Sequence, residues 1–286
     1  MRLRSLGAVP TRTFELLPEG FSELVLVIPG NPGIASLYRA FVRRLVELGE
    51  GRFGVAVASH AGHAPGLRGP QGDFGLDAQI EHHLRFLEQL SSAPRVHVVG
   101  HSIGAWLTLE VLERISSARR GQGVLLLPTV EGMAKTPAGR KLLPFLGRGA
   151  HLLRAVAGGL RKLPFRDALL ERALLTAAPE ATRAELLEGL AELSDIAIGN
   201  ALELAAEELA TVLERPEPRL EALGADLTII YGERDPWNLP TMVEAMMRDH
   251  PAVRVLRAPP SVGHAFVLED VEWVARAVIE RLSGGV

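Results

Sequence analysis

Ser102 is the residue whose neighbours most directly suggest chemistry. It lies in the sequence Gly-His-Ser-Ile-Gly at 100–104, which is the only Gly-x-Ser-x-Gly match in the chain. The match directly follows the apolar run 96–99 and begins a segment with helical periodicity near 103–115. A sharp strand-to-helix turn projects such a serine hydroxyl, and the flanking glycines let the turn pack without a Cβ clash. We therefore predict that Ser102 is a nucleophile.

A serine hydroxyl is a weak nucleophile near neutral pH, so Ser102 needs a general base, and the base needs an orienting acid. The chain offers nine histidines. His264 lies between the apolar run 253–256 and the last helical segment, which is where this arrangement places its base. We therefore predict that His264 is the general base.

The remaining histidines of interest have simpler interpretations. His97 and His101 lie in or beside an apolar strand and are expected in the core. His250 ends a polar helical segment just before a proline, so we expect it to be a solvated residue at a helix C-terminus. His82 and His83 are expected on the outer face of their helix.

Asp235 is the predicted orienting acid. It follows the apolar run 227–231, at the strand end where open α/β sheets place their sites. Glu233 is an alternative two residues earlier, and Glu131 follows an earlier strand that also accommodates such an acid. Asp226 precedes its strand and therefore lies at the wrong end.

An acyl-transfer reaction also needs fixed donors for the oxyanion of its tetrahedral intermediate. The main-chain N–H of Ile103, the residue after the nucleophile, is one expected donor. The second is expected from the loop Pro-Gly-Asn-Pro-Gly at 29–33, which follows the first central strand. Pro32 has no N–H, so we predict that Asn31 supplies this donor.

Four further residues are expected to contact the substrate, namely His60, His63, Trp106 and Trp237. The two histidines lie three residues apart on a loop, with no acidic residue inside the motif and no third ligand indicated. This is a weak basis for a metal site, so we predict hydrogen bonds beside the active site and no metal. No cofactor is expected.

The elements around these residues indicate an α/β fold with a mostly parallel sheet. Apolar runs at 24–28, 53–58, 96–99, 123–127, 227–231 and 253–256 alternate with helical patterns near 41–48, 76–90, 103–115, 240–249 and 270–282. Continuous apolar strands separated by helices are typical of a parallel sheet covered on both faces. The core is expected to comprise 1–129 and 224–286.

Residues 130–223 have a different character and predict a helical cap inserted between late strands. Strand-like runs disappear there, and Leu- and Ala-rich helical patterns follow one another. The stretch 132–166 carries eight Lys or Arg and no acidic residue, interleaved with large apolar residues as in an interfacial helix. The stretch 167–222 holds 13 acidic and four basic residues. Residues 132–166 either contact a lipid droplet or membrane surface or pair internally with this acidic half.

Composition excludes several classes of function. The chain has 286 residues, a formal charge of −3 and 47% hydrophobic residues, which is ordinary for a globular protein. Without a basic excess, nucleic acid is not expected as a partner. Cysteine is absent, which excludes disulfides, a thiol nucleophile and thiolate metal ligands. We find neither a signal peptide nor an apolar run of membrane-spanning length, so we expect a cytoplasmic protein, peripheral to lipid surfaces if 132–166 contacts them.

Several motifs together resemble the lipid droplet-associated hydrolase family, within the α/β-hydrolase fold. They are Pro-Gly-Asn-Pro-Gly at 29–33, Ser-His-Ala-Gly-His at 59–63, Gln-Ile-Glu-His at 79–82, Gly-His-Ser-Ile-Gly-Ala at 100–105, Leu-Pro-Thr at 127–129 and His-Ala-Phe at 264–266. The first, second and fourth are together more specific than Gly-x-Ser-x-Gly alone. The resemblance implies Ser102, Asp235 and His264 as a catalytic triad and an ester of a lipid as the substrate class.

The expected function is therefore hydrolysis of a carboxylic ester with an apolar, lipid-like acyl part, through an acyl-enzyme. An acyltransferase would use the same triad and differ only in the nucleophile that reaches the acyl-enzyme. A non-catalytic binding protein on a hydrolase fold is the alternative from another class, although such proteins commonly lack a triad member. Epoxide hydrolases and dehalogenases in their usual form need a carboxylate where this chain has Ser102.

Overall fold

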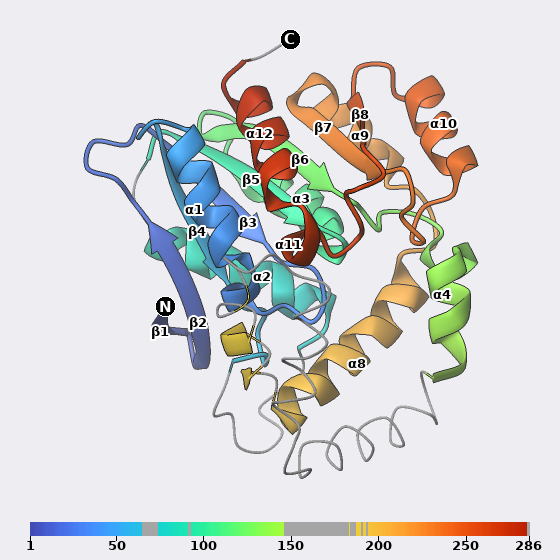
Figure 1. The fold of residues 1–286 in the computed structure, drawn as a ribbon, viewed down its shortest axis with the longest axis horizontal. Coiled ribbons are helices and arrows are strands. Elements are labelled where there is room, and N and C mark those ends of the chain that lie inside the picture. Colours follow the sequence, from blue (N-terminus) through green and yellow to red (C-terminus); the bar gives the residue numbers. More distant parts are fainter. Residues whose placement is uncertain are drawn as a thin grey trace.

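Eight strands form one sheet in the part of the chain that the structure describes, with the order β1-β2-β4-β3-β5-β6-β7-β8 (Figure 1). The structure is a computed structural model, and it describes residues 1–64, 74–90, 93–145, 183, 187–189, 191–192 and 194–284. The strands are β1 (Arg2–Leu6), β2 (Val9–Leu16), β3 (Glu23–Ile28), β4 (Phe53–Ala58), β5 (Arg95–His101), β6 (Arg120–Leu126), β7 (Leu227–Gly232) and β8 (Arg254–Ala258). The strands from β3 onward are parallel, whereas β1 and β2 pair antiparallel. The predicted α/β class is confirmed.

The apolar runs predicted six of these strands, but they did not predict the hairpin of β1 and β2. That hairpin forms the edge of the sheet and is rich in polar residues, so no continuous apolar run appears in it. Its inward positions include Thr11 and Thr13, which are fully buried although they are polar. Arg4 of β1 is hydrogen-bonded to Glu15 of β2 at 2.8 and 2.6 Å, which links the two strands across the edge.

Helices cover both faces of the sheet. Successive strand residues point to opposite sides, so an apolar strand presents apolar side chains on each face. On β3, Leu24 and Leu26 pack with α2 (Leu76–Gln89) and α3 (Ile103–Arg114) in one buried cluster. Val25 and Val27 pack on the other face, with α1 (Arg39–Leu48) and α12 (Val271–Leu282). In Figure 1, α1 and α12 lie together in front of the sheet and α3 lies behind it. The sheet is therefore buried between two helical layers.

His82 and His83 of α2 are buried, at 2% and 0% exposure, so the prediction that they lie on the outer face was wrong. His83 lies seven residues after Leu76 and three after Ile80, which places it on the apolar face of the helix. His82 is turned toward the loop after β4, where its Nε2 lies 3.1 Å from the main-chain oxygen of Ser59.

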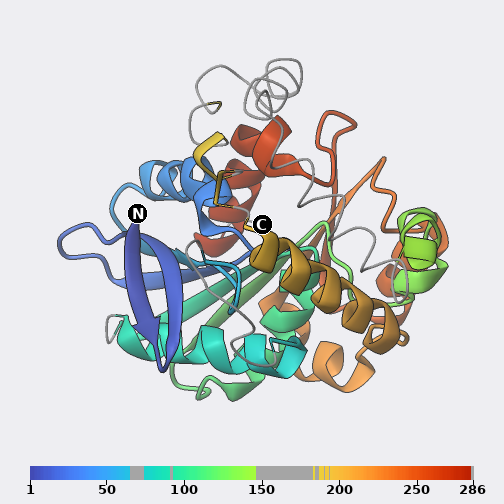
Figure 2. The ribbon, with the colours of Figure 1, turned by 90° about the horizontal axis from the view of Figure 1, so that it is seen from below.

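The described residues between β6 and β7 form helices and loops without a strand. They comprise η2 (Met133–Lys135), α4 (Pro137–Leu142), η3 (Leu143–Phe145), α8 (Asp195–Thr211) and α9 (Glu217–Leu223), followed by η4 (Gly224–Asp226). In Figure 2, which is seen from below the view of Figure 1, α8 runs diagonally across the near side of the molecule. The remaining short elements are η1 (Ala35–Tyr38), α10 (Pro240–Asp249) and α11 (Phe266–Glu269). None of the described helices is long and apolar enough to cross a membrane.

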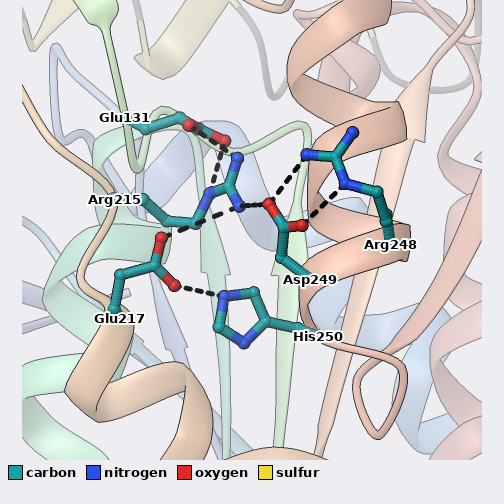
Figure 3. Close-up of polar contacts among 6 residues, drawn as sticks. All are labelled: Glu131, Arg215, Glu217, Arg248, Asp249 and His250. Atoms are coloured by element: carbon teal, nitrogen blue, oxygen red, sulfur yellow. Dashed lines mark hydrogen bonds and ion pairs between the residues drawn. The ribbon is translucent and has the colours of Figure 1, made fainter.

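Arg215 joins the beginning and the end of this helical segment to the core (Figure 3). Its Nε and Nη2 each donate to a carboxylate oxygen of Glu131 at 3.1 Å, and Nη1 lies 3.2 Å from Oδ2 of Asp249 at the end of α10. Next to it, the imidazole of His250 is bonded to Glu217. His250 does end its helix, but its expected solvation was wrong, because it is only 6% exposed and paired.

Candidate active site

The backbone at Ser102 has the strained geometry of a nucleophile elbow. Ser102 joins β5 to α3 with φ 54° and ψ −120°, a region that residues with a Cβ rarely adopt. The turn is tight enough that a Cβ at Gly104 would collide with the main-chain oxygens of Ile28 and Pro29, and one at Gly100 would collide with Gly104. Both glycines of the motif are therefore required by close backbone approach.

His264 lies between Ser102 and Asp235 within hydrogen-bond distance of both. Its Nε2 is 3.0 Å from Oγ of Ser102, and its Nδ1 is 2.9 Å from Oδ1 of Asp235. An ionised carboxylate only accepts, so Nδ1 carries the proton and Nε2 is free to accept from the serine hydroxyl. The structure thus brings together the three residues that the sequence placed in three separate loops.

Asp235 is held in place by donors from its own loop. Its carboxylate side chain is fully buried and accepts hydrogen bonds from the main-chain N–H of Trp237 and from Nδ2 of Asn238, both at 2.9 Å. These bonds provide partners for both buried oxygens and fix the orientation of the carboxylate, so that Oδ1 faces His264. The carboxylate can therefore orient the imidazole without moving.

The alternative acids lie elsewhere. Glu233 is exposed at the surface of the loop after β7. Asp226 lies in η4, before β7 begins. Glu131 has its carboxylate bound by Arg215, as Figure 3 shows. The geometry therefore favours Asp235 among the four candidates.

The loop at 29–33 lies directly against Ser102, since a Cβ at Gly30 would come within 2.8 Å of the serine Cβ. The side-chain amide of Asn31 donates to the main-chain oxygen of Ala201 at 2.8 Å and to Oε1 of Glu208 at 3.0 Å. Both amide hydrogens are thus used. Of the Asn31 donors, only the main-chain N–H remains to bind an oxyanion. The main-chain N–H of Ile103 can bind it too, because Ile103 lies in the first turn of α3 and its N–H has no acceptor within the helix.

His60 and His63 lie behind this loop and are both fully buried, so the structure does not bring them to the substrate cavity. Nδ1 of His63 lies 2.5 Å from the main-chain oxygen of Pro32, and the main-chain N–H of His60 donates to Gly33 at 2.8 Å. Burial lowers the pKa of His63 to about 4, so its ring is neutral and supports the loop as a hydrogen-bond donor.

A cavity of about 320 Å³ opens beside Ser102 and His264. Its wall is mostly apolar and includes Trp237, Met133 and Leu142. Trp106 does not line it. That side chain is on α3 and packs partly buried against the core, and none of the residues that line the cavity belongs to α3. Within the described ranges, no group of three or more His, Cys, Asp or Glu residues is arranged to hold a metal ion.

Two features of the site were missed by reasoning from the sequence. One is Glu208 of α8, a 2% exposed carboxyl that lines the cavity. The signal for it was a lone acid at helical spacing from Ile198, Ala201 and Ala205, on an otherwise apolar face. The other is Tyr38, whose hydroxyl is bonded to His101 next to the nucleophile, and no local pattern predicted that contact.

Comparison with known proteins identifies the family and the fold of this chain. The family model for lipid-droplet associated hydrolase matches residues 22–267. The lipid droplet-associated hydrolase of Gallus gallus is 30% identical over 272 residues, covering 91% of this chain and 84% of that protein. Among solved structures, an esterase from Exiguobacterium antarcticum superimposes with a TM-score of 0.66 at 15% identity, covering 99% of this chain and 98% of that one. The haloalkane dehalogenase DbeA from Bradyrhizobium elkani gives a TM-score of 0.73 at 14% identity, covering 99% and 97%.

The sheet order, the elbow and these structural neighbours define an α/β-hydrolase. Because the family model matches most of the chain, the protein belongs to the lipid droplet-associated hydrolase family.

Proposed function

We propose that this protein is a serine hydrolase that cleaves a carboxylic ester with an apolar, lipid-like acyl part. The observation that carries the proposal is the hydrogen-bonded line from Asp235 through His264 to Ser102 beside an apolar cavity. The family name and the esterase among the structural neighbours support it.

In the proposed reaction, Nε2 of His264 takes the Ser102 proton while Oγ attacks the ester carbonyl. The carbonyl electron pair moves to oxygen, and the main-chain N–H groups of Asn31 and Ile103 stabilise the oxyanion. Asp235 stabilises the imidazolium. When the intermediate collapses, His264 gives its proton to the leaving alcohol, and a water activated by the same imidazole then hydrolyses the acyl-enzyme.

Covalent labelling by a fluorophosphonate tests the nucleophile. We expect labelling of the unmodified protein and none of Ser102→Ala, with unchanged circular dichroism. Ser116→Ala is the matched control, since Ser116 is exposed after the end of α3 and should leave labelling intact. Labelling that persists in Ser102→Ala would overturn the assignment.

Turnover of p-nitrophenyl esters of increasing chain length tests the substrate class. An apolar wall stabilises each added methylene by burial, so kcat/KM should rise with acyl length until the cavity is filled. Addition of an alcohol separates hydrolysis from acyl transfer, because a transacylase would form the new ester in preference to the free acid.

We further propose that residues 130–223 act as a cap over the cavity and that 132–166 contacts a lipid surface. The described part of that stretch includes Leu142, which lines the cavity, and Leu143, which is 45% exposed. Arg140 and Lys141 are exposed beside them on α4. The rest of the stretch, 146–166, lies outside the described residues. The relatives' name, lipid droplet-associated hydrolase, supports such a contact.

A further inference from the structure

The face that α8 turns to the cavity is apolar except at one position. Ile198, Ala201, Leu202 and Ala205 all line the cavity from this helix, at spacings that place them on one side. Glu208 continues the same side and also lines the cavity. Apart from Ser102, His264 and Asn31, the other residues that line the cavity are apolar. A single carboxyl in such a wall calls for a functional explanation, because a buried polar atom without a hydrogen-bond partner is destabilising and Asn31 occupies only one of its two oxygens.

The carboxyl of Glu208 is only partly satisfied. Its Oε1 accepts the 3.0 Å hydrogen bond from Nδ2 of Asn31. Among the described residues, this carboxyl makes no other hydrogen bond or ion pair. One oxygen thus anchors the loop that carries Asn31. The second oxygen retains its hydrogen-bonding capacity.

The protonation state of Glu208 indicates which kind of group this oxygen would bind. Burial raises the pKa of Glu208 to about 8, opposed by the bond from Asn31 and reinforced by the neighbouring Glu207. At neutral pH the carboxyl is therefore mostly neutral and can both donate and accept a hydrogen bond. An ammonium group would need the ionised form. A hydroxyl suits the neutral form, since it too both donates and accepts.

We propose that Glu208 is a specificity-determining residue that binds a hydroxyl group of the substrate, so that the protein prefers apolar esters carrying a free hydroxyl near the scissile bond. This inference rests on the function proposed above. A buried group that hydrogen-bonds a substrate hydroxyl discriminates against the analogue without it, because the group is then left unpaired. The apolar residues of α8 would meanwhile hold the hydrocarbon part.

Two matched ester pairs test the proposal and locate the hydroxyl. Glycerol monobutyrate against propyl butyrate places it on the alcohol side, and methyl 3-hydroxybutyrate against methyl butyrate places it on the acyl side. For at least one pair, we expect kcat/KM of the unmodified protein to be about tenfold higher for the hydroxylated member.

Glu208→Leu should bring that ratio close to one. The variant also removes the acceptor of Asn31, but a displaced loop lowers kcat/KM for both members of a pair alike and leaves their ratio unchanged. Glu208→Gln keeps an acceptor for Asn31 and offers an N–H to the hydroxyl, so it should retain most of the preference and remain folded. Glu214→Leu, which removes an exposed acid just beyond α8, is the matched control and should not change the ratio.

A ratio near one in the unmodified protein for both pairs would overturn the proposal, as would an unchanged ratio in Glu208→Leu. In either case Ser102-dependent hydrolysis would continue, so the function proposed above would stand. Absence of Ser102-dependent hydrolysis of all four esters would overturn that function and this inference with it.

Discussion

The hydroxyl oxygen of Tyr38 lies 2.6 Å from Nδ1 of His101, the residue before the candidate nucleophile. The opposite nitrogen, Nε2, lies 2.8 Å from the main-chain oxygen of His264. Since a carbonyl only accepts, Nε2 carries the proton and Nδ1 accepts from Tyr38. The Tyr38 oxygen in turn accepts the N–H of Gly30 at 2.9 Å. One buried chain of hydrogen bonds therefore connects the loop at 29–33 with the loop that carries the candidate base.

Tyr38→Phe should lower kcat about tenfold with little change in KM. The variant leaves the Gly30 N–H and the His101 ring nitrogen unpaired, so the two loops lose their common support while the cavity keeps its lining. Two buried groups without partners should also lower the free energy of unfolding by about 2 kcal/mol. Kinetics with a p-nitrophenyl ester and urea unfolding measure the two effects.

Tyr231→Phe is the matched control, since Tyr231 is also buried, at 2% exposure, but lies in β7. If Tyr38→Phe destabilises the protein and leaves kcat at the value of the control, Tyr38 has a structural role only.

Asp235→Asn should reduce kcat by a factor of about 10³–10⁴ in a folded protein, because an amide cannot hold the imidazole as the Nδ1–H tautomer or stabilise its cation. Steady-state turnover at pH 8 measures the loss. Glu131→Gln and Glu233→Gln are the controls and should retain most activity. A larger loss in either control than in Asp235→Asn would assign the role to that carboxylate.

Arg215→Met should lower the free energy of unfolding by about 3 kcal/mol, since it leaves Glu131 without its two hydrogen bonds at a half-buried position. Denaturant midpoints measure the change. Arg248→Gln is a suitable control, because Arg248 binds the same Asp249 but has a side chain that is 70% exposed (Figure 3). Its effect should stay within about 0.5 kcal/mol. An equal loss of unfolding free energy in the two variants would contradict a stabilising role for the hydrogen bonds between Arg215 and Glu131.

The buried histidines should make the protein less stable as the pH falls from about 6.5 to about 4. Burial lowers the pKa of both His63 and His82 to about 4 from the ordinary 6.5. Between these values the unfolded chain binds protons that the folded protein excludes, so the stabilisation present above pH 6.5 is lost on acidification.

Urea unfolding at pH 7, 6 and 5 measures this slope. His63→Asn keeps a donor for Pro32 and removes one titrating group, so its slope should be shallower than that of the unmodified protein, while His82 retains its own share of the slope. A slope in His63→Asn equal to that of the unmodified protein would show that the acid sensitivity has another origin.

Binding to vesicles of anionic phospholipid should be measurable and should weaken as salt rises, if 132–166 docks on a lipid surface. Replacement of three basic residues of that stretch by Gln should reduce binding without unfolding the chain; they are Arg154, Arg161 and Lys162. If the basic and acidic halves of the cap pair with each other instead, the same change should lower stability.

A second triple variant controls for net charge. It replaces by Gln three exposed arginines that lie outside residues 130–223, namely Arg2, Arg248 and Arg276. Co-sedimentation with vesicles at 50 and 300 mM salt compares the variants. Equal binding by both triple variants, or no salt-dependent binding by the unmodified protein, would end the lipid-surface hypothesis.

The sequence by itself determined the parallel part of the sheet and the elbow, because both follow local rules. A run such as 53–58 is apolar throughout since both faces of its strand are covered, and β4 has those bounds. Ser102 could be found from its two glycines and the strand before it. Asp235 and His264 followed from the order of elements, because the carboxyl ends of parallel strands share one edge of the sheet. The hairpin of β1 and β2 at the edge of the sheet is polar and contains no continuous apolar run, so the sequence did not predict it.

Only the tertiary structure decided which side chains support the site. Periodicity shows which face of a helix is apolar, but it does not show what packs against that face. Glu208 and Asn31 are 177 residues apart, and Tyr38 and His101 are 63 apart, so no window of sequence contains either pair. The same limit applies to His60 and His63. The sequence placed them on a loop predicted to lie beside the active site. In the structure both rings are buried: His60 is bonded to His83 of α2, and His63 is bonded to the main-chain oxygen of Pro32 in the loop that carries Asn31.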